Sequence, residues 1–153
     1  MLELFSYNWE IREEWFNWCR EIDPDELTKE RAGGMGSILK NLFHVADCEQ
    51  IWMNQLQGKP VIKKDLHTIS TLDEVIEFSG MTRQQTENFL SLWTPAYGKK
   101  ELNMTSRSGK TYLFTYQKVM QHVVTHEIHH IGQLSVWARE IGKKPVSSDL
   151  IFR

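Results

Sequence analysis

The sequence predicts an all-α fold: an antiparallel four-helix bundle with a small hairpin or extended segment before the last helix. Three observations support this prediction. Four stretches place apolar residues at helical spacing, proline and glycine separate these stretches, and 153 residues are enough to bury one hydrophobic core. Neither an internal repeat nor a long linker interrupts the chain, so we expect a single domain over residues 1–153.

The first two helices are predicted within residues 4–22 and 37–56. The first ends at Pro24, which cannot continue a helix, and a short polar stretch follows it. Ser37 is a suitable N-cap for the second, and Gly58 and Pro60 end it. Each helix carries one apolar stripe, formed by Leu4, Ile11, Trp15, Trp18 and Ile22 in the first and by Ile38, Leu42, Val45, Trp52 and Leu56 in the second.

The third helix is predicted from Thr71 to Trp93. Thr71 and Glu74 have the spacing of a capping box, and Pro95 follows the end. Residues 61–70, before this helix, are expected to form a loop. The third helix buries Val75, Phe78, Phe89, Leu92 and Trp93.

The chain changes character between residues 99 and 116. Turn residues including Gly109 separate an alternating stretch from a β-favouring stretch at residues 111–114, which predicts a hairpin or extended lead-in. The fourth helix is then expected over residues 115–141, with Gly142 as its C-terminal cap.

Charge and composition exclude several classes of function. The net charge is −2 and the lysines occur in isolated pairs, so nucleic-acid binding is not expected. Residues 1–10 lack a basic start and an apolar run, and no stretch is long and apolar enough to cross a membrane. With Cys19 and Cys48 each inside a helical pattern, we expect a cytoplasmic protein with reduced thiols.

The histidines carry the chemical signal. Four of the six fall in one nine-residue window, His122, His126, His129 and His130. On a helix His126 and His130, four residues apart, point the same way and can share one metal ion. A third ligand is needed, and His44, which lies among apolar neighbours in the second predicted helix, is the leading candidate.

Residues 126–130 also satisfy His-Glu-x-x-His, the zincin protease signature in which the glutamate is the general base. The extended form of this motif requires glycine and histidine where this chain has Gln133 and Val136. Glu140 lies on the same helix and cannot fold back to the metal. A zincin is therefore the third hypothesis, and Glu127 is expected to face solvent.

The chain resembles the DinB/YfiT-like family of metalloproteins over essentially its whole length. The resemblance rests on residues 36–47, 50–52 and 122–134 taken together. It implies a four-helix bundle, a homodimer, and one zinc or nickel ion held by one histidine of the second helix and two of the last. Matched residue by residue, these ligands are His44, His126 and His130, the same three that the spacing indicates.

The resemblance also implies a class of activity. Some relatives are metal-dependent transferases that add a low-molecular-weight thiol, such as bacillithiol or mycothiol, to a small electrophile. The leading hypothesis is therefore a metal-dependent enzyme, a thiol transferase or a hydrolase, acting on a small-molecule substrate. The alternative is a non-catalytic, metal-stabilised dimeric bundle induced by damage or stress.

Several neighbours of the three histidines are open candidates for supporting roles. Asp47 is three residues after His44, and Gln133 three after His130, so either can orient a ring or face solvent. Cys48 is expected to be a buried core thiol. His122 and His129 are further candidates, whereas His67 is expected to face solvent.

Overall fold

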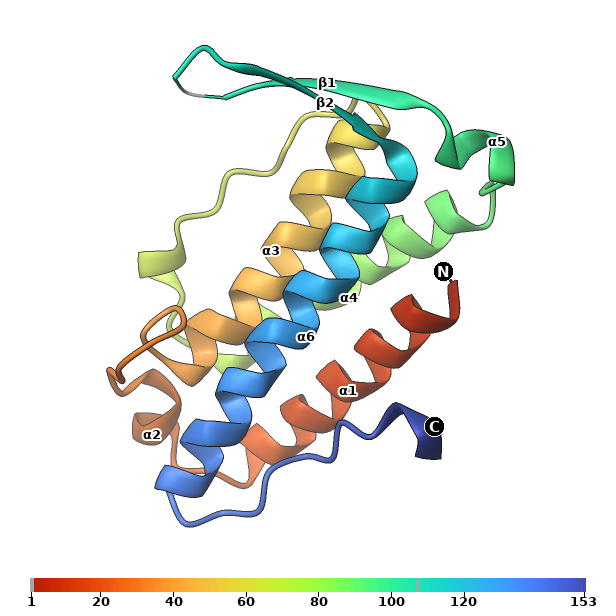
Figure 1. Cartoon of the computed structure of the whole chain (residues 1–153). Helices are drawn as coiled ribbons and strands as arrows, with labels where there is room; N and C mark the ends of the chain where they lie inside the picture. The colour runs from red at the N-terminus through yellow and green to blue at the C-terminus, as the bar shows by residue number, and fades with distance from the viewer. Residues whose placement is uncertain (1, 107) are drawn as a thin grey trace.

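The computed structural model describes residues 2–106 and 108–153, and it is mostly helical. Four long helices lie side by side (Figure 1): α1 (Leu2–Arg20), α3 (Ile38–Leu56), α4 (Leu72–Leu90) and α6 (Tyr116–Glu140). Helices α1 and α3 each contact both α4 and α6. The four long helices agree with the four predicted ones, although α4 ends three residues before Trp93.

Short elements occupy segments that were expected to be irregular. Helix α2 (Pro24–Thr28) begins at Pro24, shortly after the end of α1 at Arg20, because proline is tolerated in a first turn. Helix α5 (Pro95–Gly98) follows the same rule after α4. Two 3₁₀ turns, η1 (Leu66–Thr68) and η2 (Leu150–Phe152), complete the helical elements of the described residues.

The predicted helix caps are confirmed. The Ser37 hydroxyl accepts a hydrogen bond from the Lys40 amide at 3.2 Å. Thr71 and Glu74 form the reciprocal capping box at the start of α4. Gly142, which follows the end of α6, has φ +79°, in the left-handed region that favours glycine.

The predicted hairpin consists of β1 (Glu101–Thr105) and β2 (Thr111–Thr115), paired antiparallel with Thr105 opposite Thr111. It lies across the C-terminal end of α3 and the N-terminal end of α6 (Figure 1). Strand β2 continues directly into α6, because the Thr115 hydroxyl accepts from the Lys118 amide and caps the helix. Alternate residues of the hairpin, among them Met104 and Phe114, face the helices and are half-buried.

The apolar core falls into two clusters along the helix axes. One surrounds Trp15 and Leu42, and the other surrounds Phe5 and Met120. On α6 the second cluster ends at Val124 and the first begins at Ile131, and buried polar side chains occupy the level between them. This polar level contains the candidate functional site.

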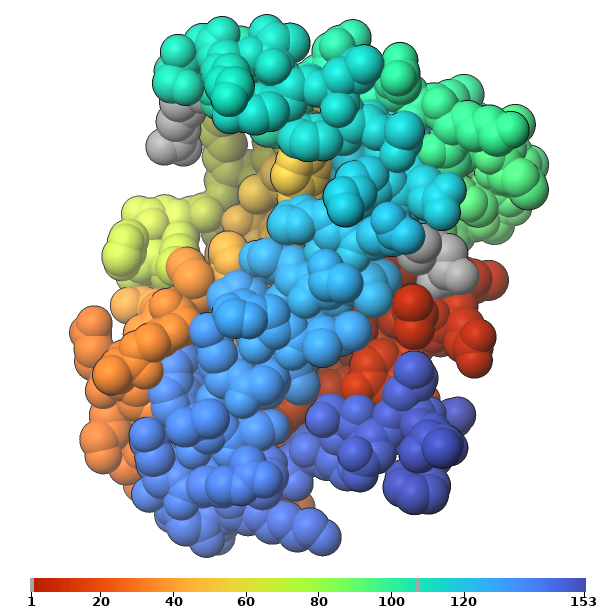
Figure 2. Space-filling view, viewed as in Figure 1, coloured from red at the N-terminus to blue at the C-terminus, as the bar shows by residue number. Residues whose placement is uncertain are grey.

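The segment after α6 turns back along α1 (Figures 1 and 2). The Tyr7 hydroxyl donates to the Ser148 carbonyl at 2.6 Å, and the Arg153 guanidinium pairs with Glu10 and Glu14. No helix in residues 2–106 and 108–153 is long and apolar enough to cross a membrane.

Candidate metal centre

Three imidazole rings converge between α3 and α6. His44 comes from the middle of α3, and His126 and His130 come from successive turns of α6. Their ligand atoms all lie within 4.8 Å of one another, and the ring centroids are 4.5–4.8 Å apart. The structure therefore brings together the three histidines that the sequence singled out.

Two of these nitrogens have the spacing of ligands to one shared divalent ion. The Nε2 atoms of His44 and His126 are 3.1 Å apart. Two metal–nitrogen bonds of about 2.0–2.1 Å that enclose an angle of roughly 100° give that separation. Imidazole nitrogen is a preferred ligand of both zinc and nickel. The trio can therefore hold such an ion with positions left for a substrate or water.

The environment keeps these rings in the neutral form that binds metals. Burial, aided by the neighbouring rings, lowers the pKa of His44 to about 4 and that of His126 to about 3. Burial also lowers the pKa of His130, against the opposing effect of the hydrogen bond that His130 donates to Gln133. All three rings therefore carry free lone pairs at neutral pH.

Two amide side chains orient the His130 ring. Its Nδ1 lies 3.1 Å from Asn41 Oδ1 and 2.8 Å from Gln133 Oε1. Both partners are oxygens that can only accept, so Nδ1 carries the proton and Nε2 is the free donor atom. Gln133 thus takes the supporting role that its position allowed. Asn41 was missed, although a polar residue one turn before His44 on the buried face of α3 was a signal.

His126 has weaker support than His130. Its Nδ1 is buried and, among the described residues, has no hydrogen-bond partner. Its Nε2 faces the His44 ring. The orientation of the His126 ring therefore depends on packing and on the contact between its Nε2 and the His44 ring.

The turn at residues 33–36, here called the glycine loop, packs against the side-chain amides of Asn41 and Gln133. Gly34, at φ +51°, lies in the turn before α3, and a Cβ there would meet Gln133 Oε1 and Trp137 Cη2 at 2.8 Å and Asn41 Oδ1 at 2.9 Å. The Trp137 ring is buried and donates to the Ala32 carbonyl at 3.2 Å. The loop can therefore approach the amides only because residue 34 has no side chain.

Glu127 does not face solvent, which corrects the sequence-based expectation. Its side chain is 3% exposed and accepts two hydrogen bonds from Arg12, at 2.8 Å from Nε and 2.6 Å from Nη2. Arg12 Nη2 also donates to Glu49 Oε2 at 2.7 Å. The outward position was wrong because α1 covers this face of α6. A carboxylate held in this way by a guanidinium does not fit the general base of a zincin.

This buried triad of Arg12, Glu49 and Glu127 was missed by sequence reasoning. Burial disfavours the Arg12 charge, but the two carboxylates outweigh it and keep the pKa of Arg12 above its usual value. Ser79 and Trp9 complete the network by accepting from Arg12 and donating to Glu49. The signal was Arg12 itself, a charged residue one turn before Trp15 on the apolar face of the first helix.

The other candidate residues, an aspartate and three histidines, differ in their exposure and in their contacts. Asp47 accepts from the side-chain amide of Gln50, on the same helix, at 2.9 Å rather than from a ring, and that amide also donates to the Ile62 carbonyl in the loop after α3. His129 is exposed and lies 3.3 Å from the Gln133 Nε2, and His67 is exposed, as expected. His122 is also exposed, and its ring lies 5.6 Å from that of His126.

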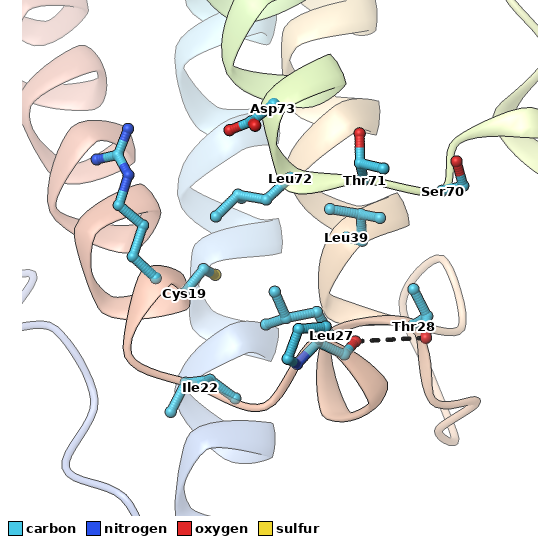
Figure 3. A pocket seen from close by; sticks show the side chains of 11 residues that line it. Cys19, Ile22, Leu27, Thr28, Leu39, Ser70, Thr71, Leu72 and Asp73 are labelled. Atoms are coloured by element: carbon cyan, nitrogen blue, oxygen red, sulfur yellow. Dashed lines mark hydrogen bonds between the residues drawn. The ribbon is translucent and has the colours of Figure 1, made fainter.

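Both cysteines are buried free thiols, as expected. Burial raises the pKa of each thiol to about 12. Cys19 lines a cavity of about 300 Å³ between α1, α2 and the start of α4 (Figure 3), at the end of the molecule away from the hairpin. Neither thiol is a thiolate at neutral pH, so neither supplies a nucleophile.

Comparisons with known proteins agree with this description. The sequence profile of the DinB family matches residues 1–153. The uncharacterised protein YizA of Bacillus subtilis (strain 168) is 38% identical over 153 residues, which cover 100% of this chain and 95% of that protein. A crystal structure of a DinB-like protein from Bacillus cereus ATCC 10987 has a similar fold, with a TM-score of 0.75 and 15% identity over 95% of this chain and 93% of that one. The chain belongs to the DinB family.

Proposed function

We propose that this protein is a metal-dependent enzyme that acts on a small molecule. One divalent ion, zinc or nickel, is held by His44, His126 and His130, and the reaction is the transfer of a low-molecular-weight thiol to an electrophile. The observation that carries the proposal is the convergence of three neutral imidazoles, with their ligand atoms within 4.8 Å of one another. Such a set leaves coordination positions open, which distinguishes catalytic from structural sites.

In this proposal the side chains orient the ligand rings, and the bound ion activates the thiol. Asn41 and Gln133 hold the proton of His130 on Nδ1, so its other nitrogen faces the trio. A bound divalent ion supplies a positive charge that favours the thiolate form of a substrate thiol at neutral pH. The thiol releases its proton to solvent water, its sulfur forms a bond to the electrophilic carbon, and the leaving group departs with the bonding electron pair.

The source of the thiol follows from the cysteines. Cys19 and Cys48 are buried, and the pKa of each is about 12, so the protein offers no reactive thiolate of its own. A thiol nucleophile must then arrive as a second substrate. This supports transfer from a small thiol such as bacillithiol or mycothiol over a mechanism with a cysteinyl intermediate.

Metal content is the first test. Protein purified without a histidine tag should hold about one equivalent of divalent ion, and His44→Ala and His126→Ala should each lose most of it. His67→Ala is the matched control, because His67 is exposed on η1 and lies outside the trio. A wild-type content below about half an equivalent, or full retention by His44→Ala, would contradict the metal site.

Turnover is the second test. Metal-loaded protein is incubated with monobromobimane and, in parallel, bacillithiol, mycothiol, glutathione or cysteine, and the fluorescent thioether is measured against the uncatalysed reaction. One thiol should give a rate that His126→Ala abolishes and His67→Ala retains. No acceleration with any thiol in fully metallated protein would overturn the transferase proposal.

A specific observation favours a second candidate function, a non-catalytic, metal-stabilised homodimer. Apolar side chains are exposed on α6, at Ile128 and Val136, and at the C-terminus, at Ile151 and Phe152. Both segments belong to the face shown in Figure 2. This candidate predicts a dimer in light scattering that dissociates with a chelator, together with the absence of turnover. A monomer would exclude it.

A further inference from the structure

A second cavity, of about 260 Å³, lies under the hairpin and has no role in the function described so far. Its walls come from the consecutive elements β1, β2 and α6 and from α3, which is distant from them in the sequence. They are mostly apolar and include two aromatic rings, with one lysine. The lining residues are Trp52, Met104, Phe114, Lys118, Val119 and His122.

The aromatic walls have fixed relative orientations. The Trp52 ring meets the Phe114 ring edge to face, with centroids 6.4 Å apart, and meets the His122 ring in the same way at 5.5 Å. Tyr112 stacks on Phe114, with ring centroids 5.9 Å apart. Aromatic rings in such arrangements form a pre-shaped slot into which another flat apolar group can insert.

His122 connects this cavity to the three histidines. Its ring is a wall of the cavity, and the same ring lies 5.6 Å from the ring of His126. His122 and His126 are one turn apart on α6, so both project on the same side of the helix. The His122 ring therefore adjoins both the cavity and the ring of His126, one of the three converging histidines.

We propose that this cavity, here called the acceptor cavity, binds the apolar group of the electrophilic substrate. The group is one aromatic ring or a short branched alkyl chain, and its reactive carbon points past His122 toward the trio. This inference rests on the proposed function, because it assigns the substrate class of that same site.

The size and the chemistry of the cavity set this class. A dry cavity of about 150 Å³ accepts benzene, so 260 Å³ accommodates one ring with a short substituent. Four of the six lining side chains, Trp52, Met104, Phe114 and Val119, are mainly apolar, so the cavity offers few hydrogen-bond partners for the hydroxyl groups of a sugar. Met104 is a flexible thioether that adapts to several apolar shapes. The acceptor cavity therefore selects small apolar electrophiles rather than one particular compound.

The test measures binding by itself, with benzyl alcohol as the probe and propane-1,2-diol as the control that lacks a ring. The six tryptophans give separate indole N–H signals in a ¹H–¹⁵N correlation spectrum, and Trp52→Phe identifies the signal of Trp52. Benzyl alcohol should shift that signal saturably and leave those of Trp15 and Trp137 unchanged. Propane-1,2-diol should shift none of them.

Filling the cavity from either side should abolish this binding. Met104→Trp adds volume from β1, and Lys118→Trp adds it from the exposed surface of α6, where folding is least at risk. Each should raise the dissociation constant at least about 10-fold, the loss expected when a well-fitted apolar group is excluded. Leu113→Trp is the matched control, because Leu113 points outward from β2 on the same hairpin and is 54% exposed.

The outcomes separate this inference from the proposed function. The acceptor cavity is overturned if the Trp52 signal of the wild type shows no saturable shift, or if Met104→Trp and Lys118→Trp both bind benzyl alcohol as tightly as the wild type does. Either result holds whatever the metal analysis shows. Loss of the metal site leaves benzyl alcohol binding intact and overturns only the proposed function. With both in place, Met104→Trp should raise the KM for an aromatic electrophile and leave the metal content unchanged.

Discussion

Asn41 and His130 contact each other twice, once through their side chains and once through a side chain and the backbone. The His130 Nδ1 lies 3.1 Å from Asn41 Oδ1, and the Asn41 amide donates to the His130 carbonyl at 2.9 Å. One fully buried asparagine thereby links α3 to α6 and orients the His130 ring.

Removing this amide should weaken metal binding. Asn41→Ala should lower the affinity for zinc about 10–100-fold, because the His130 ring loses the partner that orients it. Gln133→Ala should have a smaller effect, since Asn41 still accepts from Nδ1, and the double variant should exceed either. Competition with a fluorescent zinc chelator measures the affinities. Unchanged affinity in the double variant would show that the two amides do not orient the ring.

The glycine loop provides a test with a control one residue away. Gly34→Ala should destabilise the fold by about 2–4 kcal/mol, from left-handed strain of about 1–2 kcal/mol plus the displacement of packed atoms. Gly33→Ala carries similar strain at φ +83° but meets nothing within 4 Å, so it should cost only about 1–2 kcal/mol. Urea unfolding measures both.

The same two variants should also differ in their affinity for zinc. Gly34→Ala pushes on the Asn41 and Gln133 side chains and should weaken zinc binding, whereas Gly33→Ala should not. Equal affinities for the two variants would mean that the loop supports the fold alone.

Breaking the buried ion triad should lower the free energy of unfolding more than replacing all three of its residues with apolar ones. Arg12→Met leaves Glu49 and Glu127 buried without their cation, which should cost about 3–5 kcal/mol in unfolding free energy. Adding Glu49→Leu and Glu127→Leu removes the uncompensated charges and should recover much of this loss. Denaturant titration checks both, and a triple variant no more stable than Arg12→Met would contradict this interpretation.

The metal-free protein should lose stability on mild acidification. An unfolded histidine protonates near its ordinary pKa of 6.5, whereas folded His44 and His126 stay neutral down to about pH 4 and 3. Between these values the unfolded state binds more protons, so the free energy of unfolding falls as the pH falls from about 6.5 toward 4. Thermal unfolding in the presence of a chelator measures this slope.

His126→Ala is the internal control for that slope. This variant removes the ring with the lower of the two pKa values, so the stability of its metal-free form should depend less steeply on pH over the same window. Carboxylates titrate alike in both proteins and cancel in the comparison. An identical slope for the two would show that His126 does not stay neutral in the folded chain.

The sequence by itself determined the long helices and the three converging histidines. Local rules were sufficient here: apolar periodicity, the Ser37 and Thr71 caps, and a four-residue spacing that stacks His126 on His130 whatever surrounds the helix. His44 was added as the third ligand that such a pair requires, and family resemblance agreed with it.

Tertiary structure alone decided which polar residues are buried and what they contact. Glu127 is adjacent to His126 in the chain, yet α1 covers its face of α6 and pairs it with Arg12, 115 residues away in the sequence. Asn41 and Gly34 acquire their roles in the same way, from the approach of α3 and its preceding loop to α6. The physical reason is that helical periodicity determines the direction of a side chain relative to its own helix, whereas its partner depends on the packing of another element against that face.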